Sequence, residues 1–195
     1  MRKTLLMSAA ALSLAGLSLG GCVSIGGKAP ASLLSLTPEA APATGATASG
    51  QLADALSVLE PGADASVAVL RVPVRMAGGN VAYLKKIAWV ERPARQFQHL
   101  LAETLRSRGS RLVVEGDTAT KGMKVGGRLL AMGYDEASAS AVVRFDAMKA
   151  WPDGRVETRR FEHSVPGVKA EGEDVGPALN QAANAVAKDV ADWLG

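Results

Sequence analysis

The chain has 195 residues, with 22 lysines and arginines against 19 aspartates and glutamates and a formal net charge of +3. Arg2 and Lys3 fall in the expected signal segment described below, so the mature chain keeps 20 basic against 19 acidic residues. This balance gives no electrostatic case for a nucleic-acid partner, and a single cysteine excludes an internal disulfide framework. Because aromatic residues make up only 4%, we expect a core of small side chains, mainly Ala, Val and Leu.

The first 21 residues have the pattern of an export signal. A short basic start, residues 1–3, precedes an uncharged run, residues 4–17, that is too short for a membrane span of roughly 20 residues. Leu19, Gly20, Gly21 and Cys22 then resemble the lipobox of bacterial lipoproteins, in which the cysteine thiol receives a diacylglyceryl group and the signal is cut before it. We therefore predict a signal peptide over 1–21 and lipid attachment at Cys22. An ordinary secretory signal is the alternative.

A lipid on Cys22 would tie the mature domain to a bilayer, because several acyl chains together anchor a protein for long times. Residues 22–32 form the predicted lipidated tether, and ten extended residues reach at most about 35 Å. Val23 follows the cysteine where some bacterial lipoproteins carry an Asp that retains them in the inner membrane. By that resemblance, the protein is expected in the envelope facing the periplasm, at the outer membrane rather than the inner membrane.

The predicted domain spans residues 33–195. In its first part, the patterns that indicate secondary structure are weak. Residues 33–36 favour a short strand that ends before Pro38, and the Pro/Ala/Thr/Gly-rich stretch 37–50 is typical of a flexible surface segment. Residues 51–59 indicate one or two weak helical turns. Residues 66–74 favour a strand, and Pro73 near its end favours an edge or a stop.

The second part has clearer periodicity. A helix is predicted over 93–108, since Pro93 suits a first turn, apolar residues recur at helical spacing, and Gly109 suits the position after a helix. Strands are predicted over 111–115, 123–134, 138–149 and 155–165, then an acidic loop at 171–174 and a helix over 177–193. This order predicts an α+β fold: a mostly antiparallel β-sheet with two main amphipathic helices packed on one face.

The sequence lacks recognisable catalytic or metal-binding motifs. His99 and His163 have no cysteine or carboxylate at metal-ligand spacing, so we expect them to be solvated or partly packed. The glycines of 122–127 lack the ending of a phosphate loop and are better explained by bulges or close packing in a strand. We predict no catalytic residue, no metal, and no cofactor other than the covalent lipid on Cys22.

One stretch of the sequence is specific enough to compare with known families: VAYLKKIAWVERPARQFQHLLAETLRSRGSRLVV at 81–114. Together with the lipobox and the Leu34–Leu36 strand, it resembles the ABC-type transport auxiliary lipoprotein family, the lipoprotein partners of MCE-type lipid transporters such as the Pqi system. The matching features are Tyr83, the pair Ala88–Trp89, the helix start at Pro93, and a helix that ends before a strand. The resemblance covers roughly residues 31–195.

The resemblance implies a membrane-anchored, non-enzymatic accessory lipoprotein. Its implied partners are an MCE-domain protein and, through it, an ABC permease and ATPase, and it also implies self-association. Tyr83 and Trp89 are the candidate partner-binding residues, with amphipathic packing as the alternative. Two other functions remain open: a lipid-binding or chaperone lipoprotein that holds phospholipid itself, and a structural component of an outer-membrane assembly machine.

Overall fold

The computed structural model describes residues 32–109 and 111–195. The predicted signal peptide, the lipobox with Cys22, and nearly all of the predicted tether lie outside these residues. In chain order the elements are β1 (Ser32–Leu34), a 3₁₀ turn (Leu52–Asp54), β2 (Leu56–Val58), β3 (Gly62–Ala63), β4 (Arg71–Arg75), a 3₁₀ turn (Ala77–Gly79), β5 (Val81–Trp89), α1 (Pro93–Arg106), β6 (Val113–Glu115), β7 (Lys124–Asp135), β8 (Ser140–Ala150), β9 (Val156–Pro166) and α2 (Gly172–Leu194).

Three long strands form the antiparallel body of the sheet. β7 pairs with β8, and β8 with β9, along their full lengths. The other edge of β7 pairs in parallel with β2, β3 and β4 one after another. β6 continues the sheet beyond β2, while β5 and then β1 continue it beyond β4. The predicted α+β class is confirmed, and short parallel pairings are added to the predicted antiparallel sheet.

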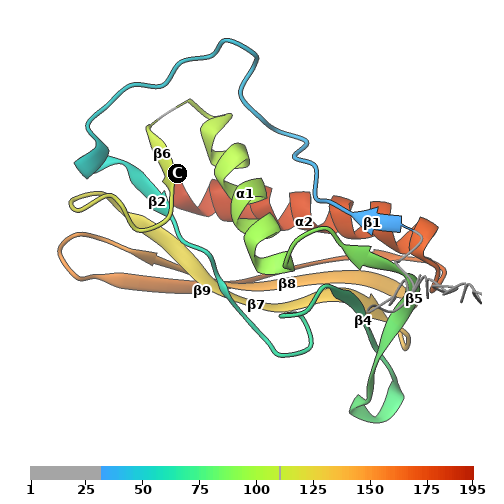
Figure 1. Ribbon diagram of the computed structural model, residues 1–195. Coiled ribbons are helices and arrows are strands. Elements are labelled where there is room, and N and C mark those ends of the chain that lie inside the picture. Colours follow the sequence, from blue (N-terminus) through green and yellow to red (C-terminus); the bar gives the residue numbers. More distant parts are fainter. Residues whose placement is uncertain (1–31, 110) are drawn as a thin grey trace, which may run out of the picture.

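Both helices cover one face of the sheet (Figure 1). α2 packs on β8 and β9 and contacts α1 as well. The apolar positions predicted to face inward are buried in both helices; they are Phe97, Leu100, Leu101 and Leu105 in α1, and Leu179, Ala182, Ala183, Val186, Val190 and Leu194 in α2. Phe97 meets Phe145 of β8 with ring centroids 4.9 Å apart. Alanines occupy much of α2's buried face, so this helix can lie close to the sheet.

The predicted C-terminal helix begins earlier than expected. α2 starts at Gly172, so Glu173 and Asp174 form its first turn instead of a loop. Acidic side chains are favourable there because the amino end of a helix carries partial positive charge. At the other helix, α1 ends at Arg106, and Gly109 has the positive φ of 64° that follows many helix ends.

Two further predictions are wrong in the first part of the domain. Residues 56–58 form the strand β2, and only Leu52–Asp54 is helical. β4 begins at Arg71, and Pro73 lies in an interior strand between β5 and β7. The sheet tolerates this proline because the pairing of β4 with β5 shifts register between Arg71 and Pro73, where a ladder hydrogen bond is already interrupted.

The glycines near the start of β7 are required by close packing, as predicted. A Cβ on Gly122 would lie 1.8 Å from the carbonyl oxygen of Ala55. A Cβ on Gly127 would lie 1.9 Å from the carbonyl oxygen of Asp146, and its φ of 140° is also unfavourable for other residues. The backbone at Ala55, just before β2, and the backbone of β8 therefore approach these glycines more closely than side chains would allow.

Candidate interaction surface

The chain enters the described domain at one end of the sheet. β1 pairs in parallel with β5, from Ser32↔Ile87 to Leu34↔Trp89. The first residues after the predicted tether are thus fixed beside the amino end of α2, where Leu34 contacts Gly176. If Cys22 carries the anchor, this end of the domain is the one nearest the membrane.

Side-chain amides of both helices hold the segment that follows β1. The backbone N–H groups of Leu36, Thr37 and Glu39 donate to Oε1 of Gln96, Oδ1 of Asn180 and Oδ1 of Asn184, at 2.9, 2.8 and 2.8 Å. The Asn184 amide also donates to the carbonyl oxygen of Thr37 at 2.9 Å. Residues 36–39 are therefore bound across α1 and α2. The flexibility predicted for 37–50 stays a prediction for the exposed residues beyond Glu39.

A hairpin between β4 and β5 projects on the side of the sheet opposite the helices (Figure 1). Its tip, residues 76–81, carries no charge and includes the exposed apolar side chains of Met76 and Val81. The N–H of Met76 donates to the carbonyl oxygen of Asn80 at 2.9 Å and closes the tip. An uncharged, exposed tip on a stable hairpin is suited to a contact with another surface.

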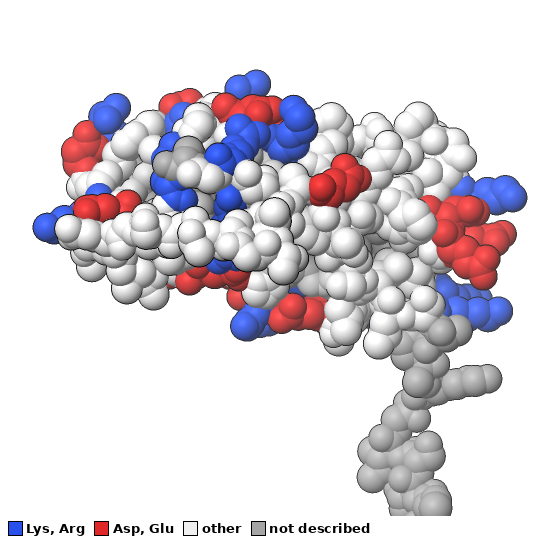
Figure 2. Space-filling view, turned by 90° about the horizontal axis from the view of Figure 1, so that it is seen from above, with Lys and Arg blue, Asp and Glu red and all other residues white. Residues whose placement is uncertain are grey.

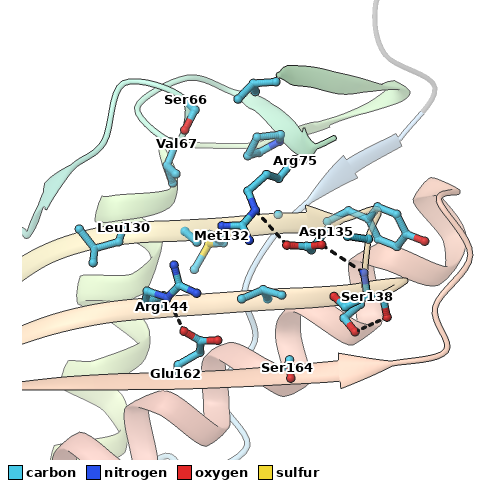
Figure 3. Close-up of a pocket in the computed structure, with 18 residues that line it drawn as sticks. Ser66, Val67, Arg75, Leu130, Met132, Asp135, Ser138, Arg144, Glu162 and Ser164 are labelled. Carbon is cyan, nitrogen blue, oxygen red and sulfur yellow. Dashed lines mark hydrogen bonds and ion pairs between the residues drawn. The ribbon is translucent and has the colours of Figure 1, made fainter. Parts of the chain in front are cut away.

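A cleft of about 520 Å³ lies beside this hairpin, on the face of β7, β8 and β9 that the helices do not cover (Figure 3). Ser66 and Val67 overhang one side of it, and Arg75 and Val81 bring the base of the hairpin to its wall. Its lining mixes four serines with apolar side chains. The lining residues are Ser66, Val67, Pro73, Arg75, Val81, Leu130–Asp135, Ala137, Ser138, Ser140, Val142, Arg144, Glu162 and Ser164.

Two ion pairs line the cleft. Nε of Arg75 lies 3.0 Å from a carboxylate oxygen of Asp135, and Arg144 is paired with Glu162. The hydrogen bond from Arg144 holds the pKa of Glu162 below its ordinary value, so this carboxylate is ionised at neutral pH. Asp135 directly follows the strand predicted over 123–134, and the sequence pattern singled out none of the other three residues. The alternation of charged residues along β8 and β9 was the available signal.

The two candidate partner-binding residues lie in different environments. Trp89 is only 2% exposed, so amphipathic packing, the alternative interpretation, describes it. Its ring N–H has no hydrogen-bond partner among the described residues. Tyr83 is partly exposed and lies opposite Pro73, and the guanidinium of Arg71 stacks 3.9 Å from its ring centroid. Partner binding by Tyr83 stays a prediction.

Each histidine is partly exposed, as expected, and each also contacts a carboxylate. His99 is paired with Glu115, and Nε2 of His163 lies 2.8 Å from Asp189 of α2. Within residues 32–109 and 111–195, no three His, Cys, Asp or Glu side chains come together in a group that could hold a metal ion. In the same residues, no helix has the length and apolar character to cross a membrane.

From the helix side, charged residues gather towards the two ends of the molecule and leave a largely uncharged middle (Figure 2). Many of them pair with the opposite charge, as in Arg108–Asp192 at 2.5 Å and Arg106–Glu103 at 2.7 Å. This surface therefore offers no large field of one sign.

The fold and these surfaces define a class of protein. It is a small α+β domain whose first described strand, β1, pairs with β5, and whose uncovered sheet face carries a projecting hairpin and a polar cleft. The chain belongs to the family of ABC-type transport auxiliary lipoprotein components, whose family model matches residues 34–191. The resemblance stated from the sequence is thereby confirmed. A comparison with curated proteins found no match.

Solved structures share this fold. The crystal structure of protein XCC0632 from Xanthomonas campestris aligns with a TM-score of 0.71 and 19% identity, over 84% of this chain and 94% of that one. A crystal structure of an uncharacterized protein aligns with a TM-score of 0.66 and 12% identity, over 76% of this chain and 97% of that one. At these identities the likeness concerns the fold alone.

Proposed function

We propose that this protein is a membrane-anchored accessory lipoprotein of an ABC/MCE-type lipid transport system, facing the periplasm from the outer membrane and contributing to lipid trafficking between membranes and to envelope integrity. The observation that carries the proposal is the family match over residues 34–191, which spans nearly all of the described domain. The ATP chemistry belongs to separate subunits, and this chain acts by binding.

The position of the exposed features supports a docking role. β1, the first described strand, pairs with β5, and β5 also supplies one side of the projecting hairpin and the partly exposed Tyr83. An anchor at Cys22 would hold this hairpin near the membrane, within reach of a transporter subunit that approaches the same bilayer. The Met76 and Val81 side chains provide apolar contact area without a charge to desolvate.

A site-specific photocrosslink in cells tests this proposal. A photoreactive amino acid replaces Val81 in the hairpin of a C-terminally tagged chain, and a matched variant carries it at Asp153, in the turn between β8 and β9. We expect an MCE-domain protein to be captured from position 81 and not from position 153. Capture of a β-barrel assembly partner, or no capture from either position, would remove the support for this role.

The cleft favours a second candidate function, direct binding of lipid. A cleft of about 520 Å³ that joins apolar side chains to two ion pairs could accept a zwitterionic headgroup together with the start of an acyl chain. The test is mass spectrometry of lipids extracted from the purified full-length protein. Phospholipid that is retained by the wild type and lost on Val142→Asp, which places a charge in the cleft, supports this function; a lipid-free wild type contradicts it.

A further inference from the structure

The chain through the β4–β5 hairpin is positively charged. Residues 65–90 contain no aspartate or glutamate but four basic residues: Arg71, Arg75, Lys85 and Lys86. Arg75 pairs with Asp135 of β7, with Nε 3.0 Å from the carboxylate. The other three are exposed, and no carboxylate of the described residues lies within 4.0 Å of their side-chain nitrogen atoms. Three cations of the hairpin therefore have no partner within the described part of the chain.

Acidic residues near the hairpin do not cancel this charge. The N–H of Glu136, in the turn after β7, donates to the carbonyl oxygen of Arg75 at 3.0 Å, so one further carboxylate stands at the hairpin base. With Asp135 counted as well, two acidic residues stand against four basic ones. The acidic first turn of α2, with Glu173 and Asp174, lies on the helix side of the sheet, whereas the hairpin projects on the opposite side (Figure 1). The hairpin thus keeps an excess of positive charge.

Lys85 and Lys86 lie on a bulge of β5. Opposite Val72 of β4, the pairing passes over four residues of β5, 84–87, so these residues bulge from the β4–β5 ladder. Within this bulge Lys86 has a φ of 62°, a left-handed conformation that glycine adopts at lower cost than lysine. Neither lysine forms an ion pair with the described residues, so their charges do not hold the bulge in place. A lysine at a position that favours glycine indicates a role for its side chain outside the fold.

Arg71 places the third unpaired charge on the uncovered face of the sheet. Strand register aligns Arg71 with Ala88 of β5 and Leu33 of β1. Because Leu34 contacts α2, Leu33 beside it faces away from the helices, and its side chain is 58% exposed. The Arg71 guanidinium lies 3.9 Å from the ring centroid of Tyr83, which restricts its orientation. Arginine and tyrosine beside apolar side chains are typical of protein interfaces.

We propose that the hairpin docks in a pocket of the partner protein that is apolar inside and acidic around its rim. The uncharged tip, with Met76 and Val81, fills the apolar part, and Arg71, Lys85 and Lys86 pair with carboxylates of the rim. This inference rests on the proposed function, because it states what surface an MCE-domain partner presents to this chain. Burial of the tip supplies affinity, while the charges orient the two proteins and speed their association.

Anionic lipid headgroups also attract cations, but two observations favour a protein. The restricted orientation of Arg71 on Tyr83 suits a carboxylate that is held in a matching position, whereas a fluid headgroup gains less from that restriction. Within residues 76–81 the exposed large apolar side chains are Met76 and Val81, a small area that fits a pocket and gives weak insertion into a bilayer. A folded protein surface is therefore the expected occupant.

Removal of the three charges tests the proposal in cells. The tagged full-length chain carries the photoreactive amino acid at position 81, and the hairpin variant combines three substitutions: Arg71→Gln, Lys85→Gln and Lys86→Gln. The control variant removes one arginine and two lysines from other exposed positions: Lys121→Gln, Arg155→Gln and Lys188→Gln. We expect the yield of crosslinked MCE-domain protein per tagged chain to fall about tenfold in the hairpin variant, since each exposed ion pair contributes a factor of about two. The control should retain the yield of the unsubstituted chain.

Salt dependence separates a charge effect from a structural one. In detergent-solubilised membranes, the crosslink yield of the unsubstituted chain should fall as salt rises from about 0.05 M to about 0.5 M, because ions screen exposed pairs. The hairpin variant should show a smaller fall than the control variant. Circular dichroism of each purified chain checks that it is folded.

Lys86→Gly tests the bulge separately. Glycine suits a φ of 62°, so this variant should unfold at no lower urea concentration than the wild type, although its crosslink yield should fall about twofold. Lys86→Arg keeps the charge and should keep the yield. A Lys86→Gly chain that is less stable than the wild type, or that crosslinks equally well, would show that Lys86 serves the fold and would contradict its place in the contact.

The outcomes distinguish the acidic pocket from the docking role on which it rests. Crosslinking that is unchanged in the hairpin variant, or that falls equally in the control, would overturn the acidic pocket and leave the docking role standing. No MCE-domain protein captured from position 81 of the unsubstituted chain would remove both. Phospholipid captured there in place of protein would assign the hairpin to an anionic bilayer and would also overturn the pocket.

Discussion

Asn184 shows how one side chain can join the two ends of the domain. Its amide is buried and bonds the backbone at Thr37, Glu39 and Asn180. Asn180 makes a similar bond to the Thr37 N–H, but at an exposed position. The difference in burial should decide which of the two matters more, because a buried backbone group left without a partner cannot bond to water instead.

We therefore expect Asn184→Ala to lower the free energy of unfolding by about 1–3 kcal/mol, measured by urea denaturation. Residues 36–39 should also become accessible to limited proteolysis. Asn180→Ala is the matched control and should cost well under half as much. Equal losses in the two variants would show that burial of the Asn184 amide is not what matters.

Trp89 is buried and Tyr83 is partly exposed, so substitution of Trp89 should affect stability and substitution of Tyr83 should affect partner binding. Trp89→Ala should cost about 3–5 kcal/mol in unfolding free energy, since it empties a large buried site. Tyr83→Ala loses a partly exposed ring and the stacked Arg71, and should cost about 1 kcal/mol. Capture of the transporter partner should fall in Tyr83→Ala although the protein remains folded; unchanged capture would mean that Tyr83 only packs.

At the scale of elements, β8 and β9 carry a ladder of ion pairs on the uncovered face. Arg144 pairs with Glu162, and Arg160 with Asp146, across the two strands. Hydrogen bonds from these arginines lower the pKa of both carboxyl groups. A group with a lowered pKa in the folded state stabilises the protein above its unfolded pKa, and this stabilisation is lost as the pH falls through the folded value.

The ladder should therefore weaken below about pH 4.5, where carboxyl groups of the unfolded chain begin to bind protons. Arg144→Gln should reduce stability at pH 7 by less than about 1 kcal/mol, because the pair is partly exposed. It should also make the loss of stability between pH 7 and pH 3 smaller than in the wild type. Lys169→Gln removes the same charge from an exposed loop, and an equal change there, in urea titrations at both pH values, would contradict the argument.

The elements differ in how well local pattern predicts them. α1, α2 and the strands β7–β9 follow from periodicity, because each buries one regular face and is bounded by strong turn residues. β5 is harder to predict. It bulges near Lys86, whose φ is 62°, so its alternation is interrupted. β2 is a strand because β7 pairs with it from far along the chain, which no local window can show, whereas most of β4 lies within the strand predicted over 66–74.

The features of the candidate interaction surface also differ in whether a local sequence pattern can predict them. The predicted lipobox is a local sequence motif that can be recognised without a fold. The cleft, by contrast, brings together Arg75 of β4, Asp135 of β7 and Glu162 of β9. Their convergence depends on the order of strands in the sheet, which the sequence pattern leaves open. The family resemblance could be seen because residues 81–114 are contiguous, and the role of each residue in them depends on burial, as Trp89 shows.

At the scale of the whole molecule, the first described strand lies at one end of the domain, and the hairpin and the cleft form separate exposed surfaces. The chain enters at β1 beside the hairpin, and the β8–β9 turn lies at the opposite end of the long strands. The free edge of β9 lies on the other side of the sheet from β1. If the anchor lies at the β1 end, the proposed contact between the hairpin and a transporter takes place close to the membrane.

This arrangement depends on the predicted lipid at Cys22, which can be tested directly. We expect the wild type to incorporate radiolabelled palmitate and to sediment with membranes, and Cys22→Ser to lose the label, because a hydroxyl cannot form the thioether that begins lipidation. Ser24→Ala, two residues further on, leaves the thiol in place and should behave as the wild type. An ordinary secretory signal would give a different result: an unlabelled wild type in the soluble fraction. Without a lipid on Cys22, neither end of the domain would be held at a membrane. The argument that places the hairpin close to the membrane would then fail.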